Sequence, residues 1–318
     1  MKRSIKLIKN RSDIGAGTRG SDLGIDAIEV AAINQNNDYF DRFEHEDVET
    51  HNESIYRKVR NSFALRIEDV YEQCTRLSQS VEQTLVEDKF PLVMSGDHSS
   101  ALGTISGIKA AYPDKTLGVI WIDAHADLHS PYTSPSGNIH GMPLAAALNK
   151  DNLQAQIHEI SGDTQKFWNA IKSIGIEGPK LRPEHLVYFG LRDTETPEDE
   201  LIERLHIRKY MVAEVRYRGL KTCVEEALER LEPCDILYIS FDVDSMDCDL
   251  ISYGTGTPVP RGFDQFEVID IIRQLIMSQK VVCFEVCEVN PLLDTKGNKM
   301  AETAFQVLDA ITKTLIDV

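Results

Sequence analysis

Acidic and histidine side chains directly follow an apolar segment of the chain, where they could bind a metal ion. In LGVIWIDAHAD, residues 117–127, the apolar run is followed by Asp123, His125 and Asp127. If the backbone stays extended, alternate side chains point to one face, so two carboxylates and an imidazole would lie together. Such ligands suit a hard or borderline divalent cation. The segment therefore predicts part of a metal site, although the same residue types also occur in ordinary polar loops.

Two other segments repeat this pattern. DILYISFDVD ends in Asp242 and Asp244, and FPLVMSGDHS turns at a glycine to deliver Asp97 and His98. Four carboxylates and two imidazoles from these segments form the candidate ligand set: His98, Asp123, His125, Asp127, Asp242 and Asp244. The set exceeds the needs of one ion and lacks cysteine, which favours two ions that share carboxylates over structural zinc. Manganese suits these ligands, which also allow iron, cobalt or nickel. Two ions would lower the pKa of a shared water toward neutrality, as in hydrolases.

Two further polar residues lie in loops after expected strands. His140 follows the central motif and could transfer a proton, whereas Glu288 could bind a cationic substrate. On residue type alone, each fits a solvated loop position equally well.

Alternating apolar and amphipathic segments predict the fold that must position these residues. Strands are expected at 4–8, 90–94, 117–122, 186–190, 209–215, 236–241 and 281–286, and helices at 26–33, 54–88, 99–111, 142–149, 165–174, from 197, 220–231, 266–277 and 300–316. Residues 36–53 are expected to be a surface loop, and 150–182 a polar excursion. This alternation favours a parallel sheet with helices on both faces, whose strands end in ligand-binding loops. No linker divides the chain, so we expect one α/β domain over residues 1–318.

Composition narrows the classes of function. The chain has 34 Lys and Arg against 51 Asp and Glu, a net charge of −17, which argues against nucleic-acid and anionic-membrane partners. Its 6 cysteines include no CxxC pair, which suits reduced thiols in the cytoplasm. No apolar run approaches the ~18 residues of a membrane span, and MKRSIKLIKN lacks the apolar region of a signal peptide. The segment GAGTRG lacks the spacing of a dinucleotide fingerprint and predicts a tight turn or a plain loop.

Four segments resemble, in order and spacing, the signatures of the ureohydrolases, the arginase and agmatinase family. They are SGDHS at 95–99, DAHAD at 123–127, SFDVDSMD at 240–247 and EVNP at 288–291. The loop SPSGNIHGMP is most similar to its arginase version, and the resemblance covers nearly the whole chain. It implies a three-layer α/β/α domain with a mainly parallel sheet of about eight strands. It also implies two Mn²⁺ ions per chain and a homo-oligomer, either a trimer or a hexamer.

The resemblance implies roles for single residues. His98, Asp123, Asp127 and Asp242 would include the ligands of one ion, and His125 and Asp244 would bind the other, with some carboxylates shared. Asp127 would relay a proton, His140 would act as proton shuttle, and Glu288 would hold the guanidinium group. The residues that would contact the substrate are His129, Ser136, Asn138, Glu195, Glu198 and Glu288. From L-arginine the products would be L-ornithine and urea.

Four positions depart from the arginase pattern. His129 and Glu195 stand where arginases usually carry Asn and Asp, which leaves agmatine, guanidinobutyrate or a formimidoyl compound as alternative substrates. Ser95 replaces the first glycine of GGDHS, and Cys248 replaces a proline, with no effect assigned from the sequence. A catalytically silent metal-binding scaffold should lack a ligand or the shuttle, and a metal-dependent deacetylase should hold a single ion.

Overall fold

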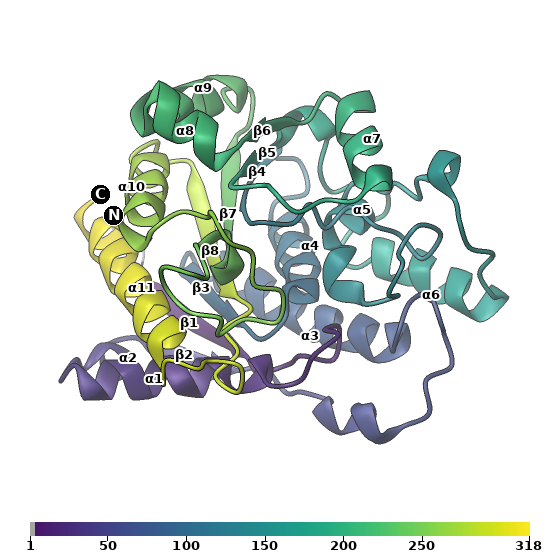
Figure 1. The fold of residues 1–318 in the computed structure, drawn as a ribbon, viewed down its shortest axis with the longest axis horizontal. Coiled ribbons are helices and arrows are strands. Elements are labelled where there is room, and N and C mark those ends of the chain that lie inside the picture. Colours follow the sequence, from purple (N-terminus) through teal and green to yellow (C-terminus); the bar gives the residue numbers. More distant parts are fainter. Residues whose placement is uncertain (1–3) are drawn as a thin grey trace.

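The computed structural model describes residues 4–318, which form a parallel β-sheet with helices on both faces (Figure 1). Within these residues the sheet has 8 strands in the order β2-β1-β3-β8-β7-β4-β5-β6, and each neighbouring pair is parallel. The strands are β1 (Ile5–Asn10), β2 (Glu44–Asp47), β3 (Phe90–Ser95), β4 (Leu117–Ile122), β5 (Leu186–Phe189), β6 (Arg208–Tyr210), β7 (Ile236–Asp242) and β8 (Val281–Cys287). The predicted fold class is confirmed.

The helices divide between the two faces of the sheet (Figure 1). One face carries α1 (Gly24–Asn34), α2 (Tyr39–Arg42), α8 (Val212–Arg218), α9 (Leu220–Arg230), α10 (Gln265–Ile276) and α11 (Lys299–Asp317). The other carries α3 (Ile67–Val86), α4 (Ala101–Ala111), α5 (Pro143–Ala147), α6 (Gly162–Lys172) and α7 (Thr196–Arg204). Successive strand residues feed opposite cores, because Ile120 packs with the first set and Trp121 with the second. Central strands are therefore buried on both faces and apolar along their length.

Helix α3 packs against α4 in the second layer at very short range. Gly103 and Gly107 of α4 make this approach possible, because a Cβ on either would lie within 2.8 Å or 2.4 Å of a backbone oxygen of α3. The facing residues of α3, which include Cys74 and Leu77, are buried. This packing fixes α4, whose amino-terminal end adjoins the SGDHS motif.

Three segments differ from the sequence prediction. The expected loop at 36–53 contains α2 and the edge strand β2, whose sequence EHED has no apolar signal because it is largely exposed. Residues 54–66 form a short 3-10 turn and a loop, and α3 begins only after Arg66, whose φ of 56° is left-handed. The expected strand at 209–215 ends at Tyr210 and continues as α8, since a short apolar run does not distinguish strand from helix.

The carboxyl ends of β3, β8, β7 and β4 adjoin one another in the middle of the sheet. The chain passes from β3 to β4 across the positions that β8 and β7 later fill, so the strand order reverses direction here. Ligands of open α/β sheets bind at such a reversal. The four motif segments leave the sheet at this edge.

The sequence also made predictions about membrane-spanning segments and about disulfide bonds. In the part that the structure describes, no helix combines the length and apolar character needed to cross a bilayer. The six cysteines, all within residues 4–318, are buried and free of disulfide bonds.

Candidate metal centre

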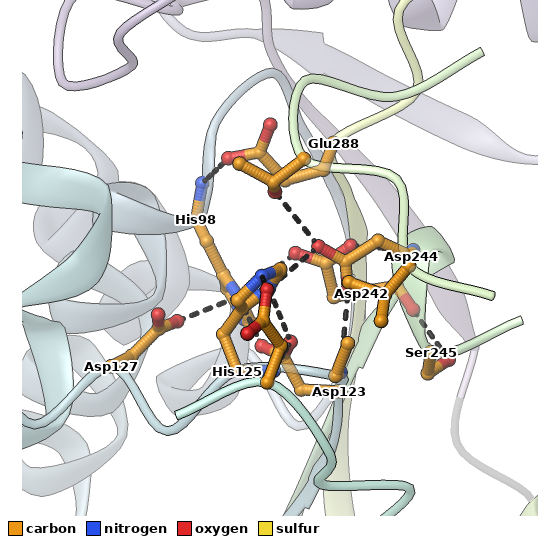
Figure 2. A network of polar contacts seen from close by, with 12 residues as sticks. His98, Asp123, His125, Asp127, Asp242, Asp244, Ser245 and Glu288 are labelled. Atoms are coloured by element: carbon orange, nitrogen blue, oxygen red, sulfur yellow. Dashed lines mark hydrogen bonds and ion pairs between the residues drawn. The ribbon is translucent and has the colours of Figure 1, made fainter. Parts of the chain in front are cut away.

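The predicted ligands from three separate motifs converge at the carboxyl edge of the sheet (Figure 2). His98 Nδ1 lies 3.0 Å from Asp123 Oδ2, 3.1 Å from Asp127 Oδ2 and 3.2 Å from Asp242 Oδ2. These donors come from the ends of β3, β4 and β7. These four residues are the group that the family resemblance implies for one ion.

A second group of donors shares Asp123 with the first. His125 Nδ1 lies 2.9 Å from Asp244 Oδ2 and 3.5 Å from Asp123 Oδ1. The two oxygens of Asp123 therefore approach different imidazoles, because Oδ2 lies near His98 and Oδ1 lies near His125. Within the described residues, potential ligand atoms of His98, Asp123 and Asp127 lie within 4.8 Å of one another, and so do those of Asp123, His125 and Asp244. This arrangement suits two adjacent cations with a shared carboxylate.

The route by which the central motif reaches the site differs from the prediction. Strand β4 ends at Ile122, and Asp127 has a φ of 52°, so the residues do not share a face by extended alternation. Instead Asp123 Oδ1 accepts a 2.7 Å hydrogen bond from the backbone N–H of His125, and the chain turns. The same turn recurs at Asp242, whose Oδ1 accepts a 2.8 Å bond from the N–H of Asp244. Tight turns therefore aim the side chains.

Several polar atoms of the site are buried but unpaired by hydrogen bonds. His98 Nδ1, Asp123 Oδ2 and Asp127 Oδ2 find no hydrogen-bond partner among the residues that the structure describes. They are close to one another, but their geometry is not that of hydrogen bonds. A buried polar atom without a partner is destabilising by about 1–3 kcal/mol. Cations between these atoms would remove that penalty, so the residues fit a metal cluster.

The pKa values support the same conclusion. Burial and repulsion from Asp123 raise the pKa of Asp127 to about 7. Burial together with Asp244 and Asp123 raises the pKa of Asp242 well above its usual range. Burial acts on Asp123 in the same direction, but the neighbouring imidazoles of His125 and His98 hold its pKa below its usual value. So many buried carboxylates need added positive charge to be ionised together at neutral pH.

His140 and Glu288 form a pair beside the metal ligands. His140 Nδ1 lies 3.1 Å from Glu288 Oε1, which also accepts a 2.9 Å bond from the backbone N–H of His98. Burial lowers the pKa of His140, but Glu288, Asp97 and Asp127 outweigh it and raise this pKa to about 9. The imidazole therefore retains its proton at neutral pH.

Asp97 plays a structural role rather than that of a potential ligand. Its Oδ2 accepts a 2.9 Å bond from the backbone N–H of Gly15, and its Oδ1 accepts a 2.8 Å bond from that of Ser99. The Gly15 carbonyl in turn accepts a 3.1 Å bond from the N–H of His140. The GAGTRG segment is thus a tight turn that supports the site, which settles the choice left open by the sequence.

A cavity of about 160 Å³ opens above the two donor groups. The predicted residues that line it are His98, His125, Asp127, His129, Ser136, Asn138, His140, Glu195, Glu198, Asp242 and Asp244. Asp123 and Glu288 are absent from this lining and lie buried behind it. Glu288 therefore adjoins the cavity through His140 rather than facing it directly.

The cavity mouth contains an unusual histidine and two glutamates. His129 Nε2 lies 3.1 Å from Glu195 Oε2 and 3.6 Å from Glu198 Oε2, and its Nδ1 lies 3.1 Å from Thr133 Oγ1. Glu198 Oε1 accepts a 3.1 Å bond from the N–H of Leu128, and its Oε2 accepts one of 3.1 Å from the N–H of Glu195. Glu198 is therefore a buried structural residue of the α7 amino terminus, whereas Glu195 is more exposed.

Sequence reasoning missed several neighbours of the ligands. Thr257 Oγ1 donates a 3.0 Å bond to Asp244 Oδ2, and Asp193 Oδ2 lies 3.6 Å from His125 Nε2. Cys287 lies with His98 and Asp242 in a third cluster of donor atoms. Thr257 comes from a loop without any distinguishing pattern. Cys287 could have been suspected because it ends β8 beside Asp242 of β7.

Comparison with known proteins identifies the family. The protein-family model described as "Arginase family" matches residues 4–313 of the sequence. The chain belongs to the arginase family. It is 34% identical over 316 residues to arginase of Bacillus subtilis strain 168, with 98% of each chain covered. The native structure of arginase from Bacillus caldovelox superposes with a TM-score of 0.84 at 33% identity, covering 97% of this chain and 98% of that one. Formimidoylglutamase from Bacillus subtilis shares the fold, with a TM-score of 0.74 and 18% identity.

Membership of the arginase family defines the class of reaction. The chain is a hydrolase that acts on guanidino compounds. Members of the arginase family use a metal cofactor, and the clustered His and Asp side chains are its candidate ligands here. The resemblance stated from the motifs is confirmed.

Proposed function

We propose that this arginase-family hydrolase cleaves L-arginine to L-ornithine and urea and uses two manganese ions per chain. The observation that carries the proposal is the sharing of Asp123 between two groups of buried donors, one around His98 and one around His125. Relatives named arginase that match along almost their whole length support the choice of arginine.

The ligand sets follow from the two groups. His98, Asp123, Asp127 and Asp242 would hold one ion, and Asp123, His125 and Asp244 would hold the other. When bound, the pair of ions supplies a water molecule that is acidic enough to be activated near neutral pH. The protein keeps its carboxylates close together and buried, so their negative charge is available to the cations and little screened by water.

His140 would donate a proton, and Glu288 is the residue expected to bind the substrate cation. His140, with a pKa of about 9, carries a proton at neutral pH that it can give to the departing amine of ornithine. Glu288 Oε1 fixes the imidazole through Nδ1. A direct contact of Glu288 with the guanidinium group stays a prediction from the family resemblance, whereas in this structure Glu288 lies behind the cavity lining. Asp127, which lines the cavity beside the proposed ions, would pass a proton on.

The cavity mouth would bind the α-amino and α-carboxylate groups. Ser136 and Asn138 offer a hydroxyl and an amide for the carboxylate, and Glu195 offers a charge for the amino group. The contact between His129 and Glu195 supports a second candidate, a substrate without the α-carboxylate such as agmatine. In that case His129 would have no carboxylate to approach, and Glu195 would stay in contact with His129 instead of binding an α-amino group.

A substrate panel tests the proposal. The purified protein, loaded with Mn²⁺ and analysed for metal content, is assayed for urea release from L-arginine, agmatine and 4-guanidinobutyrate. We expect about two ions per chain and the highest kcat/KM for arginine. No urea from arginine with efficient release from agmatine would select the second candidate. Two bound ions without any turnover would indicate the silent scaffold, and a single ion would contradict the two-ion site.

Other expectations from the resemblance stay predictions. Sedimentation of the purified protein should show a trimer or a hexamer. Fractionation of the cells that make the protein should place it in the cytoplasm.

A further inference from the structure

A second cavity, of about 290 Å³, lies at the amino-terminal edge of the sheet. Residues 115–117 at the start of β4 line it, together with Lys109 of α4 and parts of the segment 176–185 that leads into β5. Strand β4 has 6 residues and runs from this cavity toward Asp123 of the metal centre, so about 20 Å separate the two sites. The cavity is therefore distinct from the candidate metal centre.

The charged side chains that line this second cavity are mostly basic. One carboxylate stands among five basic groups, and the six residues are Lys109, Asp114, Lys115, Lys180, Arg182 and His185. This concentration of positive charge contrasts with the net charge of −17 of the whole chain. No ion pair joins the three lysines or the arginine to a carboxylate in the part of the chain that the structure describes. The cavity therefore attracts anions.

Three of the basic side chains are buried, with 3% of Lys180 and 7% each of Lys109 and His185 exposed. Lys180 Nζ donates one hydrogen bond, to the carbonyl of Lys172, so two of its three protons have no partner among the described residues. His185 Nδ1 is also buried and lacks a hydrogen-bond partner there. Lys109, in contrast, donates to three carbonyls of the turn before β4 and contributes its charge alone. Lys180 and His185 are therefore the groups that a bound anion could contact directly.

Burial without a paired carboxylate shifts the pKa values of these groups. It is the largest cause that lowers the pKa of Lys180, to about 8, and it also lowers the pKa values of Lys109 and His185. The acids that oppose these shifts are all exposed: Asp114, Glu177, Glu184 and Asp235. An anion beside the buried bases would favour their protonated forms and offset the effect of burial.

We propose that the second cavity binds a small phosphorylated metabolite, with its phosphate group in contact with Lys180 and His185 and attracted by the charges of Lys109, Lys115 and Arg182. A phosphate group carries about 1.5–2 negative charges at pH 7 and three strong acceptor oxygens. It therefore matches four cations beside one carboxylate better than a singly charged anion does. Ammonium groups bind phosphate as point charges. The volume approaches the ~300 Å³ of the smallest ligand pockets, which leaves room for more than the phosphate itself.

Calorimetric titration of the Mn²⁺-loaded protein tests the site. Inorganic phosphate and glycerol 3-phosphate are the probes, and succinate at the same ionic strength is the carboxylate for comparison. Lys180→Met removes the buried ammonium, and Arg182→Glu reverses an exposed charge at the cavity, a change that the fold should tolerate. The control is Lys9→Met, which removes a buried lysine of β1 that is paired at 2.8 Å with Glu29. Glu29 keeps a cation in this control, because Arg11 lies 3.1 Å from the same oxygen.

We expect the wild type and Lys9→Met to bind glycerol 3-phosphate with the same affinity within about twofold, and both to bind it more tightly than succinate. Lys180→Met should weaken this binding by about 10–100-fold, because a charge-assisted hydrogen bond is lost. Arg182→Glu should weaken it by about tenfold through repulsion, which tests the site even if Lys180→Met fails to fold. Glycerol 3-phosphate should also raise the melting temperature of the wild type and leave that of Lys180→Met nearly unchanged.

Three results would overturn the phosphate site. If neither phosphate probe binds the wild type at millimolar concentration, the cavity is not a phosphate site. If both cavity variants bind the probes as tightly as Lys9→Met does, the phosphate binds elsewhere, for example at the metal ions. If succinate binds more tightly than glycerol 3-phosphate, the assignment to phosphate is wrong. The proposed hydrolysis of arginine is unaffected by these outcomes, because the substrate panel tests it at the other edge of the sheet.

Discussion

Replacement of His140 by Asn should abolish most of the turnover while preserving the site. The Asn side-chain amide can occupy the place of the imidazole Nδ1–H and donate to Glu288, whose Oε1 lies 3.1 Å from Nδ1 in the wild type. The backbone bond from residue 140 to the Gly15 carbonyl is independent of the side chain. The change therefore removes a transferable proton and little else.

The size of the effect follows from the protonation of His140. Because Glu288 and nearby acids raise the pKa of His140 to about 9, most molecules hold the proton needed by the leaving amine at pH 7.5. Asn cannot supply one. Loss of a positioned general acid lowers rates by about 10²–10⁴-fold, and we expect kcat for arginine to fall within this range.

The assay compares urea release at saturating arginine and pH 7.5 with Mn²⁺ content measured on the same samples. A suitable control is His45→Asn, because His45 lies exposed on the edge strand β2 and should have no effect on turnover. A kcat for His140→Asn within about threefold of the wild type, at unchanged metal content, would refute the role of His140. A fall in turnover accompanied by metal loss would show that the residue acts on the site's structure instead.

Four other changes have defined outcomes. His129→Asn should free Glu195 to bind the α-amino group of arginine. We expect KM for arginine to fall about fivefold, which corresponds to about 1 kcal/mol for this partly exposed pair, with kcat unchanged. A raised KM would show that His129 itself binds the substrate. Lys180 is buried, and burial lowers its pKa to about 8, so the folded state is disfavoured whenever this lysine is charged. Because the unfolded chain keeps that proton up to about pH 10.5, the free energy of unfolding of the wild type should rise from pH 8 to 10.5. At pH 7, Lys180→Met should be more stable than the wild type by at most about 3 kcal/mol. Urea unfolding curves should show that this difference has disappeared at pH 10.5. Chelation of Mn²⁺ should lower the melting temperature, because each ion present at 100 times its Kd adds about 2.7 kcal/mol, and Asp123→Asn should be nearly insensitive to added Mn²⁺.

Much of the fold and the identity of the site were accessible from the sequence. Central strands such as β4 and β7 are buried on both faces, so each is a continuous apolar run that a local pattern reveals. The candidate ligands were accessible because acids and histidines directly after such runs stand out by type and spacing. The edge strand β2 could not be predicted from the sequence, because it is exposed and its residues are polar. Its strand conformation comes from pairing with β1, which is a long-range contact.

The sequence by itself determined which side chains are available to a metal site and that each follows a strand. The tertiary structure alone decided that β3, β8, β7 and β4 are neighbours, and hence that His98 meets Asp123 and Asp242. It also decided that Asp97 supports a loop by accepting a hydrogen bond from the backbone N–H of Gly15. The physical reason is the separation along the sequence over which each effect acts. Periodicity and turn chemistry act over a few residues, whereas strand order and register bring together residues nearly 200 positions apart.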